Sequence, residues 1–128
     1  MRKLLPILLS ALMLTGCAGT SNNQTNTYRQ ITMDEAVAKM AEETGYIILD
    51  VRRADEFAAG HIPGAINVAN ESIGTDEIPE LPDKNQLIMV YCRSGRRSKE
   101  ASEKLVKLGY TNIVEFGGIL DWKDEIEI

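Results

Sequence analysis

The sequence contains little cysteine and almost no histidine: two cysteines and one histidine in 128 residues. Cys17 ends an apolar N-terminal segment, and Cys92 is the one cysteine in the rest of the sequence. The histidine, His61, lies in a turn beside Pro63, where a structural role is more common than that of a general base. Cys92 is therefore the candidate nucleophile.

Arginine is also scarce, and its positions are uneven. The chain is acidic, with a formal net charge of −5, and only six arginines follow residue 17. These are Arg29, Arg52, Arg53, Arg93, Arg96 and Arg97. Guanidinium groups hold oxyanions with paired hydrogen bonds. An acidic chain that places three of these arginines directly after Cys92 therefore predicts a local anion site.

Cys92 is expected at a turn between a strand and a helix. Residues 86–91 have the length and composition of a buried strand, and the spacing of apolar residues predicts a helix over about 98–108, with Gly109 as a stop. Backbone N–H groups of such a turn, with the helix dipole, form a cradle for an anion and favour thiolate over thiol. The competing interpretation is that Cys92 is an inert residue of the core.

The N-terminal segment has the features of a targeting signal. Residues 1–16 combine a positive start with an apolar run that is too short to span a bilayer permanently. With Cys17, they resemble the lipobox of bacterial lipoproteins, which implies acylation of Cys17, cleavage before it and a membrane anchor. Residues 17–27 then form the lipidated cysteine and a flexible polar tether. The expected location is outside the cytoplasm, lipid-anchored to the bacterial cell membrane or to an outer membrane if present.

Residues 28–128 are enough for one domain. Apolar patterns predict helices over 33–41 and 54–59, strands over 46–51, 65–68 and 112–116, and a glycine turn at 117–118 that opens a terminal helix. Strands that alternate with helices predict an α/β layer fold. We call residues 92–98 the cysteine loop. Because ligands of open parallel sheets bind at the carboxyl ends of the strands, Asp50 and Arg52 are expected near this loop.

Several motifs, in this order, resemble the landmarks of a single-domain rhodanese. They are Asp50-Val51-Arg52, Glu56-Phe57, the run from Gly60 to Ala65, the run from Cys92 to Ser98, and Gly117-Gly118-Ile119 with Trp122. The resemblance implies a three-layer α/β domain with a central parallel sheet flanked by helices. It also implies a sulfurtransferase that moves sulfane sulfur from a donor such as thiosulfate to cyanide or a thiol.

The resemblance assigns roles to particular residues. Cys92 is the catalytic residue that forms a persulfide, Asp50 and Arg52 support the loop, and the remaining loop residues bind the substrate. Those loop residues are Arg93, Ser94, Gly95, Arg96, Arg97 and Ser98. The expected partners are a small anionic sulfur donor, a thiol or cyanide acceptor, and the membrane through the lipid anchor. No cofactor, metal or nucleic acid is expected, and the sequence specifies no oligomeric state.

Three alternative functions compete with sulfur transfer. A disulfide exchanger is disfavoured because no second cysteine is available once Cys17 is lipidated. A non-catalytic rhodanese-like binding module is disfavoured because it has no reason to keep the cysteine and its arginines together. A cysteine-dependent phosphatase or arsenate reductase also uses a thiolate in an anion cradle. Its Cys-x5-Arg pattern requires an arginine at position 98, where this chain has Ser98, and Tyr91 stands where a histidine is expected.

Overall fold

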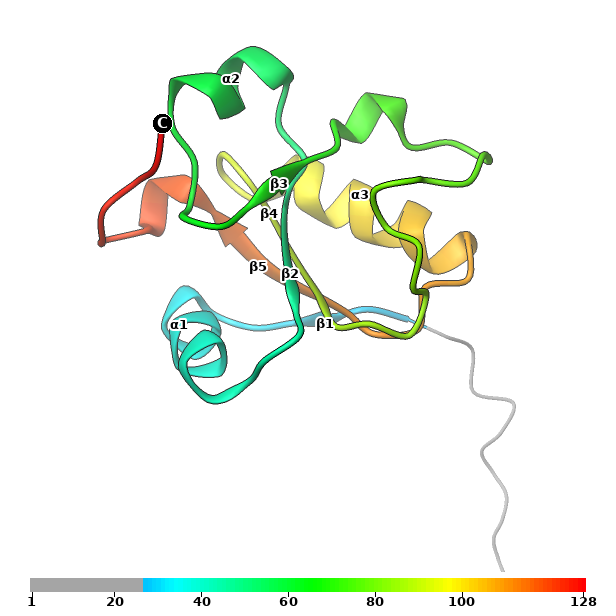
Figure 1. Ribbon diagram of the computed structural model, residues 1–128, viewed down its shortest axis with the longest axis horizontal. Coiled ribbons are helices and arrows are strands. Elements are labelled where there is room, and N and C mark those ends of the chain that lie inside the picture. Colours follow the sequence, from blue (N-terminus) through cyan, green and yellow to red (C-terminus); the bar gives the residue numbers. More distant parts are fainter. Residues whose placement is uncertain (1–26) are drawn as a thin grey trace, which may run out of the picture.

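A computed structural model describes residues 27–128 of the chain. Five parallel strands form one sheet in the order β1-β5-β4-β2-β3 (Figure 1). The strands are β1 (Arg29–Gln30), β2 (Ile47–Asp50), β3 (Ile66–Asn67), β4 (Ile88–Cys92) and β5 (Ile113–Gly118). The helices are α1 (Met33–Glu42), α2 (Ala54–Ala59) and α3 (Arg96–Lys107), with 3-10 turns η2 (Asn70–Ser72) and η3 (Ile119–Asp121). The arrangement confirms the predicted α/β fold with a central parallel sheet.

The sheet has a hydrophobic core on each face. Successive side chains of a strand point to opposite faces, so Val90 and Cys92 pack in the core that includes Leu105 of α3. Met89 and Tyr91 pack in the other core, which includes Ala36 of α1. All five residues of β4 are buried. Burial on both faces explains why this strand reads as one continuous apolar run.

The first helix begins where its sequence signal predicts. Thr32 is the N-cap of α1, and its hydroxyl accepts a hydrogen bond from the backbone N–H of Glu35 at 3.1 Å. The Glu35 carboxylate accepts in return from the backbone N–H of Thr32 at 2.8 Å. This reciprocal capping box satisfies two N–H groups that the helix itself leaves unpaired.

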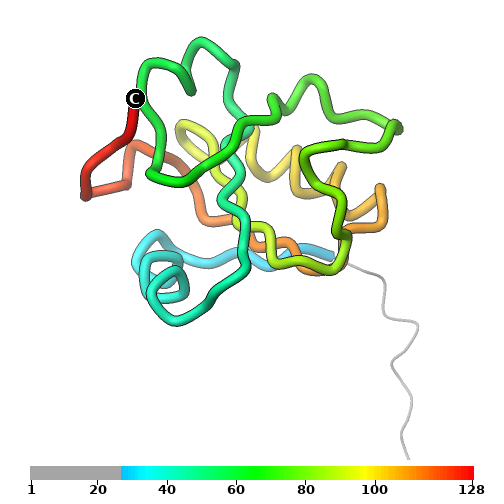
Figure 2. The backbone as a smooth tube through the Cα atoms, viewed as in Figure 1, coloured from blue at the N-terminus to red at the C-terminus, as the bar shows by residue number. Residues whose placement is uncertain are grey.

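The carboxyl ends of the parallel strands meet at one edge of the sheet. Asp50 of β2 pairs with Tyr91, and Cys92 of β4 pairs with Gly118 of β5. In Figure 2 the segments that follow β2, β4 and β5 come together at this edge. The topology thus places the end of β2 beside the cysteine loop, as the sequence predicts.

The predicted terminal helix is wrong. Gly117 and Gly118 continue β5 instead of forming a turn, and only the short 3-10 turn η3 follows. The chain then returns to the turn after α2, where Glu127 forms an antiparallel bridge with His61 through backbone hydrogen bonds of 2.9 and 2.8 Å. These long-range backbone bonds take the place of helical ones.

The start of the described chain contains a strand that the sequence pattern does not predict. This short strand, β1, pairs with β5. A two-residue strand is too short for a periodic pattern. The predicted signal segment, Cys17 and most of the tether lie outside the described residues. Within residues 27–128, no helix is both long and apolar enough to cross a membrane.

Candidate active site

Cys92 is the last residue of β4 and is only 1% exposed. Its sulfur accepts a hydrogen bond from the backbone N–H of Gly95 at 3.0 Å. Gly95 caps the N-terminus of α3 with a φ of +116°, a left-handed conformation that glycine adopts without a steric penalty. The sulfur therefore lies at the start of a 12-residue helix, where the helix dipole favours negative charge.

The end of β5 packs directly against the backbone of the cysteine loop. A Cβ atom on Gly118 would overlap the carbonyl group of Arg93, so only glycine allows this approach. The carbonyl oxygen of Arg93 also accepts a hydrogen bond from the backbone N–H of Leu120 at 3.2 Å. The glycine landmark of the sequence thus has a steric reason, because it lets β5 and the loop pack backbone against backbone.

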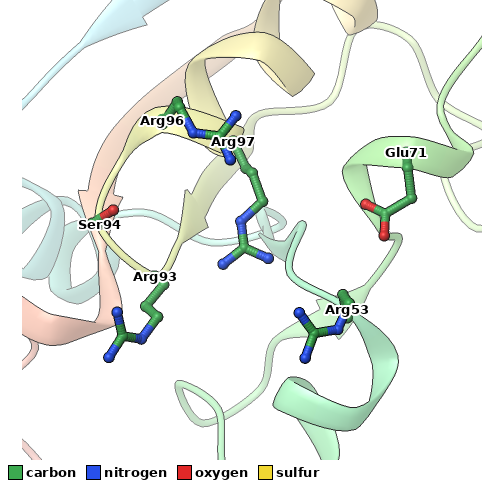
Figure 3. A pocket seen from close by; sticks show the side chains of 6 residues that line it. All are labelled: Arg53, Glu71, Arg93, Ser94, Arg96 and Arg97. Carbon is green, nitrogen blue, oxygen red and sulfur yellow. The ribbon is translucent and has the colours of Figure 1, made fainter.

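Side chains of the cysteine loop and of two neighbouring segments surround a hollow of about 380 Å³. The lining residues are Arg53, Glu71, Arg93, Ser94, Arg96 and Arg97 (Figure 3). In Figure 3 the guanidinium groups of Arg53 and Arg97 point toward the same space, and that of Arg93 points away from them. Four of the six lining side chains are arginines, and three of these are also paired with carboxylates: Arg53 with Asp55, Arg96 with Glu100 and Arg97 with Glu56. Their guanidinium groups offer the paired N–H donors that suit an oxyanion. The structure therefore brings Arg53 and Glu71 to the site in addition to the predicted loop residues.

Arg97 is held by a carboxylate from α2. Its guanidinium nitrogens donate to the two carboxylate oxygens of Glu56 at 2.7 and 3.2 Å. This hydrogen bond is the main reason that the pKa of Glu56 is lowered to about 2, and burial opposes the shift. The pKa of Arg97 is raised, chiefly by the same bond, with a smaller contribution from Cys92. Glu56 was one of the family landmarks in the sequence, but its place opposite Arg97 depends on the tertiary fold.

Asp50 and Arg52 form a buried pair beside the cysteine loop. Arg52 donates to the Asp50 carboxylate at 2.7 to 3.0 Å and to the carbonyl oxygen of Gly60 at 2.7 Å. The hydroxyl of Tyr91 donates to Asp50 at 2.6 Å. Burial lowers the pKa of Arg52, but the bond and charge of Asp50 outweigh it and leave that pKa raised. The pair of Asp50 and Arg52 is thus connected to the cysteine loop by the hydrogen bond from Tyr91, the residue before Cys92, and not by backbone N–H groups of the loop.

Ser98, predicted as a substrate-binding residue, lies behind the hollow and not on its wall. It is fully buried in α3 and does not line the hollow. Its hydroxyl oxygen lies 3.4 Å from the sulfur of Cys92 and 2.5 Å from a carboxylate oxygen of Glu115. Sequence reasoning missed Glu115, which is 2% exposed. The available signal was an acidic residue inside the apolar run of β5.

His61 makes structural contacts, in agreement with the sequence prediction. Its ring stacks on Phe57 with the ring centroids 3.8 Å apart, and its Nδ1 lies 2.9 Å from the Phe57 carbonyl oxygen. Its Nε2 lies 3.5 Å from the carboxylate of Glu127. Residues 27–128 contain no group of three or more acidic, histidine or cysteine side chains arranged to hold a metal ion.

The fold and the site together define a class: a parallel α/β domain whose central strand ends in a cysteine at an arginine-rich turn that begins a helix. Residues 32–125 match the family model of the rhodanese-like domain. The chain belongs to that family.

Known relatives and solved structures agree with this assignment. The chain is 37% identical over 73 residues to the thiosulfate sulfurtransferase PspE of Escherichia coli, a match that covers 57% of this chain and 70% of that protein. A solved rhodanese from E. coli, described with anions, is 33% identical, with a TM-score of 0.58 over 64% of this chain and 96% of that one. A rhodanese-like domain protein of Staphylococcus aureus is 32% identical, with a TM-score of 0.64 over 78% and 97%.

Proposed function

We propose that this protein transfers sulfane sulfur from a small anionic donor such as thiosulfate to a thiol or cyanide through a persulfide on Cys92. The observation that carries the proposal is the backbone N–H of Gly95, 3.0 Å from the sulfur, in a turn whose arginines face an open hollow. The relative named as a thiosulfate sulfurtransferase supports the choice of donor.

In the first half of the reaction, the Cys92 thiolate attacks the outer sulfur of thiosulfate. A new S–S bond forms, the S–S bond of the donor breaks, and sulfite leaves with the electron pair. The arginines of the hollow gather the dianionic donor and stabilise the charge on departing sulfite. The Gly95 N–H and the start of α3 stabilise negative charge at the cysteine.

In the second half, cyanide or a thiolate attacks the outer sulfur of the persulfide. The S–S bond at Cys92 breaks, and the thiolate of Cys92 returns as the leaving group. The products are thiocyanate or a new persulfide on the acceptor. Each half-reaction moves one neutral sulfur atom between nucleophiles, so no external oxidant or reductant is consumed.

An assay of thiocyanate formation from thiosulfate and cyanide tests the proposal, with a phosphatase assay run on the same preparation. We expect thiocyanate from the wild type and none from Cys92→Ser, because a hydroxyl does not form a persulfide and ionises far less readily. Absence of thiocyanate with the wild type would favour the non-catalytic binding module. Phosphate release that depends on Cys92 would favour the phosphatase alternative instead.

The proposed location is outside the cytoplasm, on a membrane to which acylated Cys17 attaches the domain. The support is the charge and apolar pattern of residues 1–16 and the position of the cysteine directly after them. Acylation with more than one chain gives stable anchoring, because a single chain binds a membrane only weakly. The polar residues that follow then separate the domain from the lipid surface.

A further inference from the structure

A second ionisable group is buried one hydroxyl away from Cys92. Glu115 is 2% exposed, and its Oε2 accepts from the backbone N–H of Gly117 at 2.9 Å and contacts the hydroxyl of Ser98 at 2.5 Å. The Ser98 oxygen lies 3.4 Å from the sulfur of Cys92. No basic side chain forms an ion pair with Glu115 among the described residues. The contacts form a continuous path from sulfur to carboxylate.

The single proton of the Ser98 hydroxyl has several acceptors within reach. The Glu115 oxygen lies at 2.5 Å, the carbonyl oxygen of Gly95 at 2.9 Å, and the sulfur and the Gly117 carbonyl oxygen at 3.4 Å. A hydrogen bond to a carboxylate is shorter and stronger than one to a neutral acceptor. An ionised Glu115 therefore accepts the hydrogen bond of the Ser98 hydroxyl and leaves the serine oxygen free to accept one from the Cys92 thiol.

An ionised Glu115 and a Cys92 thiolate oppose each other. Both groups are almost fully buried. Ionising both in a site that water solvates poorly costs far more free energy than ionising one of them. The cluster is most stable with one negative charge and one shared proton. The Gly95 N–H and the start of α3 favour that charge on the sulfur.

We propose that Glu115, through Ser98, takes the thiol proton of Cys92 and stores it while the cysteine is anionic. In the less stable arrangement, with a neutral thiol, the thiol donates to Ser98 and Ser98 donates to the Glu115 carboxylate. In the reactive arrangement, protonated Glu115 donates to Ser98 and Ser98 donates to the thiolate. The S–H bond breaks and a carboxyl O–H bond forms, so the proton count of the cluster is unchanged. Glu115 and Ser98 are positioning residues, because they act through the sulfur of Cys92 and do not line the hollow.

Two neighbours of Glu115, Gln30 and Tyr28, do not take up the proton that Glu115, Ser98 and Cys92 share. Gln30 of β1 contributes a neutral amide, whose nitrogen lies 3.4 Å from Oε1 of Glu115. The pKa of Tyr28 is raised by burial and, to a smaller extent, by the charges of Glu103 and Glu115. A tyrosine with a raised pKa stays neutral and neither supplies nor removes charge at neutral pH.

The proposal rests on Cys92 being the reactive thiol of the proposed function, but its test requires no sulfur donor. Infrared difference spectroscopy of the full domain, before and after alkylation of Cys92 with iodoacetamide, reads the protonation of Glu115 directly. We expect the reduced wild type to show the carbonyl band of a protonated carboxylic acid, and alkylation to remove it because the neutral thioether lets Glu115 ionise. Absence of the band from the reduced protein would overturn the proposal, even in an active sulfurtransferase.

Two variants assign the band. Glu115→Gln removes the carboxyl and should abolish the band, whereas Glu103→Gln removes an exposed carboxyl from α3 and should leave it unchanged. A band that persists in Glu115→Gln belongs to another residue and contradicts the proposal. Circular dichroism and the melting temperature verify that each variant is folded before the spectra are compared.

Ser98→Ala tests the path between the two groups. Without the hydroxyl, Glu115 has no route to the thiol proton, and we expect alkylation of Cys92 at neutral pH to slow by about tenfold or more, since a positioned base contributes at least this much. The substitution removes one oxygen atom from a buried site, so thermal melting must first show a folded variant. An unchanged alkylation rate in folded Ser98→Ala would exclude the serine from the path.

Discussion

Three arginines at the site are already paired with carboxylates of the protein. Arg97, one of three arginines in the cysteine loop, is engaged by both oxygens of Glu56. Arg96 is paired with Glu100 on its own helix at 3.1 Å, and Arg53 with Asp55 at 3.0 Å. These pairings fix the directions of the guanidinium groups around the hollow. They also partly neutralise the positive charge that an incoming anion meets.

Arg97 is expected to act on the charge of the sulfur donor. Arg97→Gln should weaken the use of thiosulfate more than the use of an uncharged sulfur donor, because the arginine acts on the dianion and on departing sulfite. The measurement is kcat/KM with each donor. Arg29→Gln is the matched control, since Arg29 bonds to Asn112 on the surface. Equal losses with both donors would assign Arg97 a structural role.

The pair of Glu56 with Arg97 should make stability depend on pH in the acid range. The carboxyl pKa of Glu56 is about 2 in the folded protein against an ordinary value of 4.5. A lowered acid pKa stabilises the fold fully above pH 4.5, and this contribution is lost as the pH falls toward 2. Glu56→Gln should therefore melt at a lower temperature than the wild type at neutral pH. The difference between the two melting temperatures should narrow as the pH falls from 4.5 toward 2. A constant difference from pH 7 to acid, like that of the exposed control Glu42→Gln, would contradict the assignment.

Among the elements, β5 determines where the cysteine loop lies. Gly118→Ala would place a methyl group on top of the Arg93 carbonyl, so the loop or the strand must move. We expect a loss of about 1–3 kcal/mol in the free energy of unfolding, as for other overpacked sites, together with reduced sulfur transfer. Gly74→Ala is the control, because the added methyl meets no atom within 4 Å.

Urea unfolding and the thiocyanate assay measure the two effects of Gly118→Ala. Wild-type stability and activity in this variant would show that the loop does not depend on close contact with β5. A loss of stability with full activity would separate the packing role from the placement of Cys92.

The connection between β2 and β4 should matter for stability more than for chemistry. Asp50 is completely buried and binds both Arg52 and Tyr91. Asp50→Asn leaves the buried Arg52 guanidinium without its counter-charge, which costs about 3–5 kcal/mol in the free energy of unfolding. Asp34→Asn breaks an exposed pair with Lys123 and should cost far less. An altered pH–rate profile in Asp50→Asn at unchanged melting temperature would instead indicate a catalytic role.

At the scale of the whole molecule, the domain is expected to work while attached to a membrane. Mass spectrometry of the membrane fraction should find a mature N-terminus at acylated Cys17, and Cys17→Ala should yield an unlipidated form that is soluble or unprocessed. A mature N-terminus at any other residue would refute the anchor. Cys92→Ser is the control, since it should leave membrane attachment unchanged.

Elements with a local pattern could be predicted from the sequence alone. The capping box at Thr32 and the apolar runs over 46–51 and 86–91 predicted α1, β2 and β4, because helix caps and buried strands have short-range signatures. The alternation of strands and helices predicted the parallel sheet, and the crowding of arginines after Cys92 agrees with the arginine-lined hollow. Each of these inferences needed only residues close together in the chain.

Contacts between distant side chains became known only from the folded structure. Glu56 and Arg97 are separated by 41 positions, and Ser98 and Glu115 by 17, yet each pair is in direct contact. The C-terminal segment forms a bridge with His61 and not a helix, because backbone bonds available across the fold replaced local ones. Side-chain pairing of this kind depends on strand order and register, which place residues together irrespective of their spacing in the sequence.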